Sequence, residues 1–333
     1  MVRKLVKKLS ACVLAAAVVA GLTGCGSVTS GKRIVRISHA QSETHPEHLG
    51  LLAFKKYVEE RLGDKYEVQI FPNELLGSAQ KAIELTQTGA IDFVVAGTAN
   101  LETFASVYEI FSMPYLFDSE DVYKSVMQDT DYMEKIYEST DEAGFRVVTW
   151  YNAGTRNFYG KKPINTPDDL KGMKIRVQQS PASVAMVNAF GAAAAPMSFG
   201  EVYTAIQQGV IDGAENNVTA LRDHGDVTKY YCFDEHTRIP DMVIISSNIW
   251  NQFSDDQKSA VTECAKAATE EYKTAWKNFE DEVLDKAVNQ NGVELVKDVD
   301  IAAFQSAVQP IYENLKTANP TTYAVVEEIR AMV

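Results

Sequence analysis

The sequence has almost none of the motifs that mark an enzyme. It contains no G-x-S-x-G elbow, no G-x-x-x-x-G-K-[ST] phosphate loop, no G-x-G-x-x-G after a strand, no H-E-x-x-H and no C-x-x-C. Among only five histidines, His45 and His48 in "THPEH" have a spacing that could hold a metal, but a loop running into a helix explains them equally well. We therefore predict no enzymatic activity, no metal site and no cofactor.

Cysteine and long apolar runs are also scarce. The run "ACVLAAAVVAGL" (11–22) has twelve residues, whereas a membrane span needs about 20. It follows "MVRKLVKK", which carries four positive charges and no acid, so residues 1–24 are typical of a secretory signal peptide. Of the four cysteines, Cys12 lies in this segment, while Cys232 and Cys264 could form a disulfide outside the cell or remain buried thiols.

The remaining cysteine directly follows the apolar run. The residues Leu22-Thr23-Gly24-Cys25 resemble the lipobox of bacterial lipoproteins, in which the cysteine is acylated and becomes the new N-terminus. The resemblance implies lipidation at Cys25, followed by a flexible tether over 25–32. We expect an extracytoplasmic domain that a lipid anchors to the outer face of the bacterial cytoplasmic membrane. An ordinary signal peptide cleaved elsewhere is the alternative.

Basic residues are fewer than acidic residues. The chain has 32 Lys and Arg against 45 Asp and Glu, a formal net charge of −13. So acidic a surface argues against nucleic acid and anionic membrane lipid as partners. A small organic acid is not excluded, because a pocket can be positive on an acidic protein.

The order of predicted elements indicates an α/β fold with two lobes. Strands are predicted at 33–39, 66–71, 92–97, 146–151, 174–178 and 241–247, with amphipathic helices between most of them. Such alternation predicts a largely parallel sheet in each lobe. Two stretches, 76–97 and 197–216, are weakly alike, since each runs from a loop through a helix to a glycine and then Ile-Asp. The expected ligand site is the cleft between the lobes, beyond the ends of the strands.

One long helix is predicted over 254–292. Its apolar residues follow the 3.6-residue period, Ser254 is a suitable N-cap, and Asn291-Gly292 ends it. Such a helix would be about 55 Å long, longer than one lobe. We expect it to run across both lobes; two shorter helices with a kink are the alternative.

Two arginines beside aromatic and amide residues are the candidate ligand contacts. Arg176 lies in the short strand "KIRV", on the opposite face from Ile175 and Val177. Arg156 lies twenty residues earlier, in the loop "WYNAGTRNFYG" that is predicted to follow a strand. A guanidinium fork matches a carboxylate, so the two could converge on one anion. Two solvated surface arginines are the alternative.

A set of longer segments is more specific. They are, in order, "FPNELLGSAQKAIELTQTGAIDF", "MPYLF", "YNAGTRNFY", "INTPDDLKGMKIRVQQSP", "APMSFGEVYTAIQQGVIDGAENN" and "SNIWNQFSDDQK". Together they resemble the solute-binding proteins of TRAP (tripartite ATP-independent periplasmic) transporters over about residues 33–290. The resemblance implies a two-lobe fold like that of periplasmic binding proteins, with a long helix spanning both lobes and the ligand in the cleft between them.

The resemblance also implies roles for single residues. In that family the arginine of "KIRV", here Arg176, makes a two-pronged salt bridge to the substrate carboxylate. The arginine of "GTR", here Arg156, is a second anion contact. The asparagine after "DG-x-E", here Asn216, points into the cleft, and the aromatic residue before "GEVY", here Phe199, packs on the ligand.

The class of acid is predicted from other segments. "SHAQSETHPEHLG" (38–50) is similar to family members that take sugar acids such as uronates, with His45 and the helix after it closing the sugar end. Gln80 stands where many sugar-acid binders carry a charged residue. Members that bind C4-dicarboxylates or keto acids share the same arginine. Amide side chains both donate and accept hydrogen bonds and so suit a hydroxyl-rich ligand; the candidates are Asn152, Gln178, Asn216 and Asn217.

The sequence thus predicts an extracytoplasmic solute receptor of a TRAP transporter. We expect a monomer that binds a small organic monocarboxylate, a sugar acid such as a uronate, and delivers it to membrane subunits. Lobe I is predicted over 33–150 plus about 242–280, and lobe II over 151–241 plus about 281–333. A C4-dicarboxylate or keto-acid receptor of the same system is one alternative, and a secreted carbohydrate-active lipoprotein enzyme is another.

Overall fold

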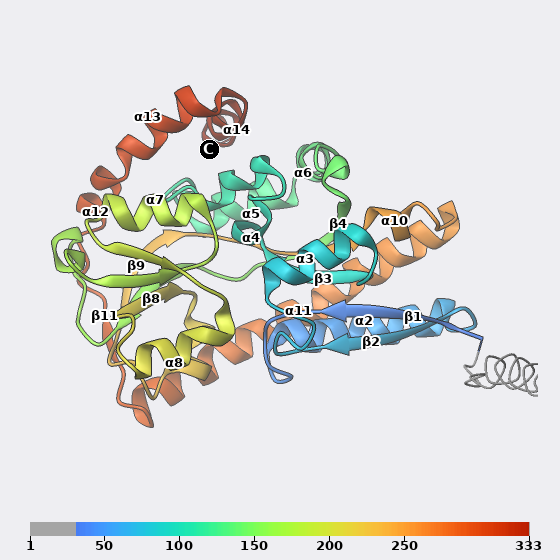
Figure 1. The fold of residues 1–333 in the computed structure, drawn as a ribbon, viewed down its shortest axis with the longest axis horizontal. Helices are drawn as coiled ribbons and strands as arrows, with labels where there is room; N and C mark the ends of the chain where they lie inside the picture. Colours follow the sequence, from blue (N-terminus) through green and yellow to red (C-terminus); the bar gives the residue numbers. More distant parts are fainter. Residues whose placement is uncertain (1–30, 333) are drawn as a thin grey trace, which may run out of the picture.

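The computed structural model describes residues 31–332, so the predicted signal peptide, Cys25 and most of the tether lie outside the described residues. Within this range the chain forms two β-sheets, each packed against its own helices, and one long helix that crosses between them (Figure 1). No helix among residues 31–332 is long and apolar enough to cross a membrane.

The first sheet has five strands in the order β2-β1-β3-β10-β4. Their bounds are β1 Arg33–Ser38, β2 Tyr66–Phe71, β3 Phe93–Gly97, β4 Phe145–Tyr151 and β10 Asp241–Ser246. All five were predicted from the sequence to within about a residue at each end. Strand β1 is parallel to β2 and β3, whereas β10 is antiparallel to both β3 and β4.

The second sheet has six strands in the order β11-β9-β5-β8-β6-β7. Their bounds are β5 Arg156–Gly160, β6 Lys174–Val177, β7 Ala193–Pro196, β8 Gly213–Asn216, β9 Tyr230–Thr237 and β11 Glu294–Val296. Only β6 was predicted. Strand β5 is antiparallel to its neighbours β8 and β9, while the other neighbouring pairs are parallel.

Each sheet is therefore parallel except for one reversed strand, and the prediction of largely parallel sheets is confirmed. The reversed strands, β5 and β10, are the two that the chain forms directly after leaving a strand of the other sheet. The chain passes from β4 to β5 through residues 152–155 and returns from β9 to β10 through residues 238–240. Tyr151 pairs with Asp241 and Arg156 with Thr237, so these two links run side by side between the sheets.

Apolar side chains cover both faces of each sheet. In β3, Val94 and Ala96 pack in one core and Phe93 and Val95 in another, as the period of two along a strand requires. The helices around the first sheet are α2 Pro46–Leu62, α3 Ala79–Thr88, α4 Thr98–Leu101, α5 Glu120–Gln128, α6 Thr130–Glu138 and α10 Ser247–Trp250, with 3-10 turns η1 Ser106–Ser112 and η2 Asp141–Ala143. Around the second sheet are α7 Pro181–Ala189, α8 Val202–Gln207, α9 Leu221–His224 and α12 Ile301–Ala307, with η3 Pro167–Leu170, η4 Phe199–Glu201 and η5 Val218–Ala220.

The weak likeness between the two halves of the sequence has a structural basis. After α3 and α8, Gly89 and Gly209 adopt the left-handed conformation that ends a helix, with φ of 80° and 71°. The aspartate that follows each glycine then bonds to the neighbouring parallel strand. Asp92 accepts from the backbone N–H of Arg36, and Asp212 accepts from that of Lys174, each at 2.8 Å. The same turn thus sets strand position in both sheets.

The predicted long helix is a single helix, α11, Asp255–Asn289, as expected. Ser254 caps it, accepting a hydrogen bond from the backbone N–H of Gln257. Its buried residues from Val261 to Trp276 pack in a core of the first sheet, and those from Phe279 to Ala287 in a core of the second. Figure 1 shows it crossing the molecule from one half to the other.

The C-terminal helices differ from the predicted lobe division. Phe304 of α12 packs in a core of the second sheet. Helices α13, Gln309–Ala318, and α14, Pro320–Ala331, instead bury Tyr312, Leu315, Val326 and Ile329 in a core of the first sheet. Residues 309–331 therefore do not follow the predicted assignment of 281–333 to lobe II.

A buried glutamate, away from α11, joins the two halves of the molecule, the first half being built on the five-stranded sheet and the second on the six-stranded sheet. Glu102, directly after α4, is buried, and its Oε1 accepts hydrogen bonds from the Ser180 hydroxyl at 2.8 Å and the Ala182 backbone N–H at 3.0 Å. Both donors belong to the start of α7, where backbone N–H groups lack helical partners and the helix dipole favours an acid. A carboxylate from one half thus caps a helix of the other.

The two cysteines in the described range are buried, unpaired thiols. Cys232 lies in β9 within a core of the second sheet, and Cys264 lies in α11 within a core of the first. Of the two possibilities left open by the sequence, the structure has the buried thiols rather than the disulfide.

Candidate ligand-binding site

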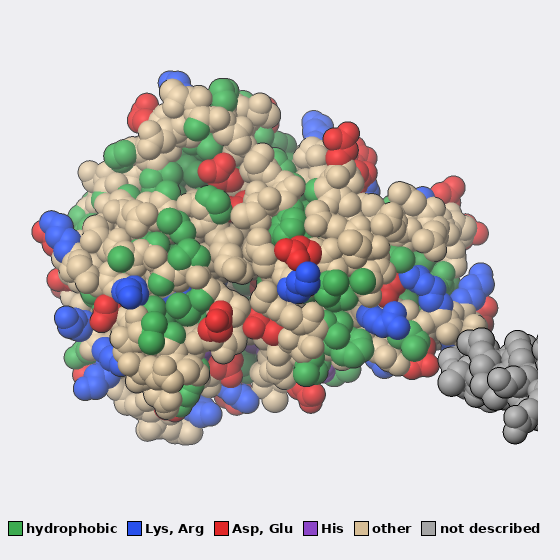
Figure 2. All heavy atoms as spheres, viewed as in Figure 1, with side chains coloured by type: hydrophobic (Ala, Val, Ile, Leu, Met, Phe, Trp, Pro, Cys, Tyr) green, Lys and Arg blue, Asp and Glu red, His purple; other side chains and the backbone are tan. Residues whose placement is uncertain are grey.

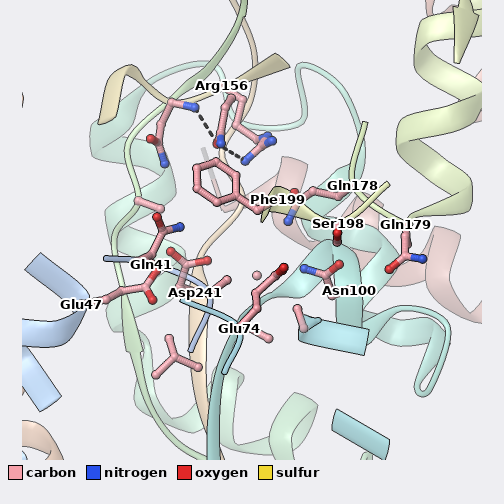
Figure 3. Close-up of a pocket in the computed structure, with 18 of the residues that line it drawn as sticks. Gln41, Glu47, Glu74, Asn100, Arg156, Gln178, Gln179, Ser198, Phe199 and Asp241 are labelled. Carbon is pink, nitrogen blue, oxygen red and sulfur yellow. Dashed lines mark hydrogen bonds between the residues drawn. The ribbon is translucent and has the colours of Figure 1, made fainter. Parts of the chain in front are cut away.

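A cavity lies between the two sheets, where the links pass from one to the other (Figure 3). From the first half it is lined by residues near the start of α2, the turn before α3, and the end of β3. From the second half it is lined by residues at the ends of β6 and β8 and at the start of η4. Its position agrees with the predicted cleft.

Arg176 lines this cavity from the end of β6. It is 3 % exposed, and its Nε and Nη2 donate to the backbone carbonyl of Met197 at 3.1 and 2.9 Å. A guanidinium has five N–H donors, so three remain for another partner. Within residues 31–332 it has no ion-pair partner, although burying a cation without one is costly. Arg176 is therefore suited to a ligand carboxylate.

Arg156 is placed differently from its prediction as a loop residue. It is the first residue of β5 and only 5 % exposed. Its Nε and Nη2 donate to the carboxylate of Glu215, at 2.5 and 3.0 Å, and its Nη1 donates to Oδ1 of Asn216 at 2.6 Å. Arg156 borders the cavity, but most of its donors are already engaged.

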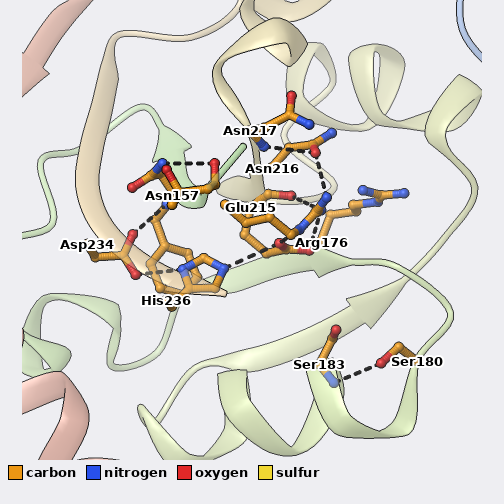
Figure 4. Close-up of polar contacts among 12 residues, drawn as sticks. Asn157, Arg176, Ser180, Ser183, Glu215, Asn216, Asn217, Asp234 and His236 are labelled. Carbon is orange, nitrogen blue, oxygen red and sulfur yellow. Dashed lines mark hydrogen bonds and ion pairs between the residues drawn. The ribbon is translucent and has the colours of Figure 1, made fainter. Parts of the chain in front are cut away.

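The partner of Arg156 continues a buried chain of charges (Figure 4). Glu215 in β8 also lies 3.4 Å from Nε2 of His236 in β9, and Nδ1 of that histidine lies 2.6 Å from Asp234. Asp234 in turn accepts from the backbone N–H of Phe158 at 2.9 Å. The charges alternate along the chain, which allows all of them to be buried.

Each charge in this network is stabilised by its neighbours. Burial alone would raise the pKa of Glu215, but Arg156 and His236 outweigh it and lower that pKa to about 2. Burial would likewise lower the pKa of His236, but Asp234 and Glu215 raise it to about 9. Both groups are therefore charged at neutral pH.

These shifts predict how stability depends on pH. The lowered pKa of Glu215 contributes stability above about pH 4.5, which is lost as the pH falls toward 2. The raised pKa of His236 contributes stability below about pH 6.5, which is lost as the pH rises toward 9. In urea unfolding, His236→Gln should therefore lower the free energy of unfolding more at pH 6 than at pH 9. A difference that does not change with pH would mean that His236 is neutral in the folded protein.

Three further predicted residues also line the cavity. They are Asn216, the last residue of β8, Asn217 directly after it, and half-buried Phe199 at the start of η4. Oδ1 of Asn216 accepts hydrogen bonds from Nη1 of Arg156 and from the backbone N–H of Asn217. Gln178, one of the candidate amides, lines the cavity too, and its Oε1 is buried with no partner in the described residues.

Three predicted residues lie outside the cavity lining. His45 caps α2, and its Nε2 lies 3.3 Å from the Thr219 hydroxyl while its ring packs against Phe279 of α11. Gln80 donates to the Thr103 hydroxyl at 2.9 Å. Asn152 accepts from the backbone N–H of Gly154 in the first link. None of the three lines this cavity, and each bonds to a neighbouring residue.

The predicted alternative of a metal at His45 and His48 finds no support in their surroundings. Nδ1 of His48 lies 3.0 Å from Nε2 of His39, whereas His45 faces Thr219. Among residues 31–332, no group of three or more His, Cys, Asp or Glu side chains is placed to hold a metal ion.

Several acids at the cavity were missed from the sequence. Glu47 in the first turn of α2, Asp241 at the start of β10 and Glu74 before α3 all line it. Glu74 reaches the second half, since a Cβ added to Gly200 of η4 would lie 2.8 Å from its Oε2. In so acidic a chain, no single carboxylate stands out. The one available signal was position, because Asp241 directly precedes an apolar strand and Glu47 follows a proline at a helix start.

Comparisons with known proteins point to one family. The family model described as "Bacterial extracellular solute-binding protein, family 7" matches residues 37–318. The chain is 28% identical to the 2,3-diketo-L-gulonate-binding periplasmic protein of Escherichia coli, over 87% of this chain and 89% of that one.

Solved structures show the same fold. A TRAP periplasmic solute-binding protein from Anaerococcus prevotii with bound D-glucuronate is 46% identical, with a TM-score of 0.87 over 90% of this chain and 98% of that one. Another from Sulfitobacter sp., with bound β-D-galacturonate, is 31% identical, with a TM-score of 0.86 over 90% of this chain and 100% of that one. The fold predicted from the sequence is thus confirmed.

Proposed function

The chain belongs to the family of bacterial extracellular solute-binding proteins, family 7, and on that premise we propose that it is the TRAP receptor for a hexuronate such as D-glucuronate. The family is one of transport receptors that work outside the cytoplasm with membrane subunits. We expect a monomer whose lobes close over the ligand by bending at links 152–155 and 238–240, with no turnover of the ligand.

The observation that carries this proposal is the guanidinium of Arg176, which has no ion-pair partner among the described residues and lines a cavity that also presents several amide and carboxyl side chains. One carboxylate would satisfy the cation, and the hydroxyl groups of a sugar ring would satisfy the amides and carboxyls. The bound hexuronates of the two similar structures have this chemistry.

The proposal predicts the outcome of a ligand screen. D-glucuronate or D-galacturonate, at 100 times its Kd, should stabilise the folded protein by about 2.7 kcal/mol, which thermal unfolding detects. D-glucose, which lacks the carboxylate, should have no effect at the same concentration. Stabilisation by succinate or a 2-keto acid, with none by either hexuronate, would contradict the proposal and favour the alternative acids.

We also propose that a lipid on Cys25 holds the receptor at the membrane. Cys25→Ser should release the protein into the soluble fraction without lowering its melting temperature, because residue 25 precedes the first strand and every core residue. Cys264→Ser, which changes a buried thiol of α11, is the matched control and should stay with the membrane. A Cys25→Ser protein that still sediments with membranes would contradict lipidation.

A further inference from the structure

Two carboxyl groups at the cavity lie together on the first half. Glu47, in the first turn of α2, is 3 % exposed, and Asp241 begins β10. Both line the cavity, and Figure 3 shows the two carboxyl groups side by side near Gln41. Two carboxylates that lie together away from water repel each other when both are ionised, which favours a pair that holds one proton.

The proton belongs to Glu47. Burial, followed by the nearby Asp241, raises the pKa of Glu47 well above its usual value. Burial also raises the pKa of Asp241, but only to about 6, because the neighbouring Glu47 and the charge of Arg156 favour its ionised form. At neutral pH Glu47 is therefore the neutral carboxylic acid and Asp241 the carboxylate, so the pair has a net charge of −1.

No cation of the described residues neutralises that charge. Arg156, whose charge acts on Asp241, is already paired with Glu215. Nδ1 of His39 lies 3.8 Å from Glu47, but burial lowers the pKa of that histidine to about 3, so it is neutral. The cavity therefore has a positive group, Arg176, in the second half and a negative one, Asp241, in the first.

The side-chain amide of Gln178, from the second half, lies near Asp241. A Cβ added to Gly97 would lie 3.0 Å from Nε2 of Gln178 and 3.2 Å from Oδ1 of Asp241, so both groups converge on this glycine. Oε1 of Gln178 is buried and has no partner among the described residues. The amide nitrogen of Gln178, a donor, thus lies on the side of Asp241, while its unpartnered Oε1 would be satisfied by a ligand group that donates a hydrogen bond.

We propose that the Glu47–Asp241 pair selects ligands with one carboxylate, by bonding to hydroxyl groups at the end of the ligand away from Arg176 and repelling a second carboxylate there. A sugar hydroxyl donates to Asp241, while a carboxylate in its place meets a like charge with no cation to offset it. This inference rests on the proposed function, and it explains how the site would separate hexuronates from dicarboxylates that share the same arginine.

Calorimetric titration with D-glucuronate and D-glucarate tests the inference. The second ligand keeps the sugar hydroxyl groups and adds a carboxylate at the other end. Wild-type protein should prefer D-glucuronate by about 100-fold or more, and Asp241→Asn should reduce that preference at least about tenfold. Glu47→Gln should keep the preference within about threefold, because the neutral partner is replaced by another neutral donor while Asp241 stays charged.

Glu102→Gln is the matched control. Glu102 is buried like the pair but does not line the cavity, so this variant should keep the wild-type preference. If Asp241→Asn does not fold, as judged by circular dichroism, Asp241→Ser removes the same charge with a smaller side chain.

The outcomes separate the two proposals. A folded Asp241→Asn that keeps the wild-type preference overturns the role of the pair and leaves the hexuronate function standing. If Glu47→Gln loses as much of the preference for D-glucuronate as Asp241→Asn does, the assignment of the negative charge to Asp241 is overturned. Wild-type protein that binds no hexuronate overturns the proposed function and, with it, this inference.

Discussion

Arg176→Ala should weaken hexuronate binding by roughly 30- to 4,000-fold. Removing one partner of a buried ion pair typically costs about 2–5 kcal/mol, and about 1.4 kcal/mol corresponds to tenfold in Kd. Arg176 is 3 % exposed and has only the carbonyl of Met197 as a partner in the described residues, so the ligand carboxylate would be left unpaired by the change. Calorimetric titration with D-glucuronate measures the loss.

Two further variants show whether the fork or merely the charge matters. Arg176→Lys should recover part of the affinity, because an ammonium keeps the charge but loses the planar fork. Arg36→Ala, which removes an exposed arginine from β1, should leave Kd unchanged. If folded Arg176→Ala binds D-glucuronate with a Kd within threefold of the wild-type value, Arg176 is not the carboxylate contact.

Glu215→Ala should lower the free energy of unfolding by about 3–5 kcal/mol, the usual cost of breaking a buried ion pair from one side. Glu215 is 1 % exposed and is the carboxylate that faces both Arg156 and His236. His236 can release its proton when that partner is lost, but the guanidinium of Arg156 cannot. Chemical unfolding at pH 6 measures the change.

A double variant distinguishes the loss of the ion pair from the loss of packing. Arg156→Met with Glu215→Met removes both charges, and replacing a whole buried pair with apolar residues is often neutral. The double variant should therefore be more stable than Glu215→Ala alone. A cost below about 1 kcal/mol for Glu215→Ala, as for an exposed pair, would contradict the buried network.

The strands that could be predicted are those made of apolar residues. Strands β3 and β10, "FVVAG" and "DMVIIS", are buried on both faces and are apparent from composition alone. Strands β5 and β8 were missed because they carry buried polar residues, among them Arg156, Asn157 and Glu215. Their burial depends on partners from other strands, and no local pattern reveals those.

As with the strands, only some residues of the site could be predicted from the sequence. A resemblance of motifs was enough to expect Arg176, Asn216, Asn217 and Phe199 at the cavity, where the structure places them. The acids of the first half could not be chosen among 45 Asp and Glu residues. What sets Asp241 apart is its pairing with Tyr151 across the two links, a contact between residues ninety positions apart.

The contact between Glu102 and α7 has a consequence for hydrogen exchange. The Ala182 amide bonds to a side chain of the other half of the molecule rather than to its own helix. When the two halves separate, this amide loses its acceptor and becomes open to solvent, while amides deeper in α7 keep theirs within the helix. The exchange rate of one backbone hydrogen at the start of α7 therefore measures how often the two halves come apart, independently of any ligand.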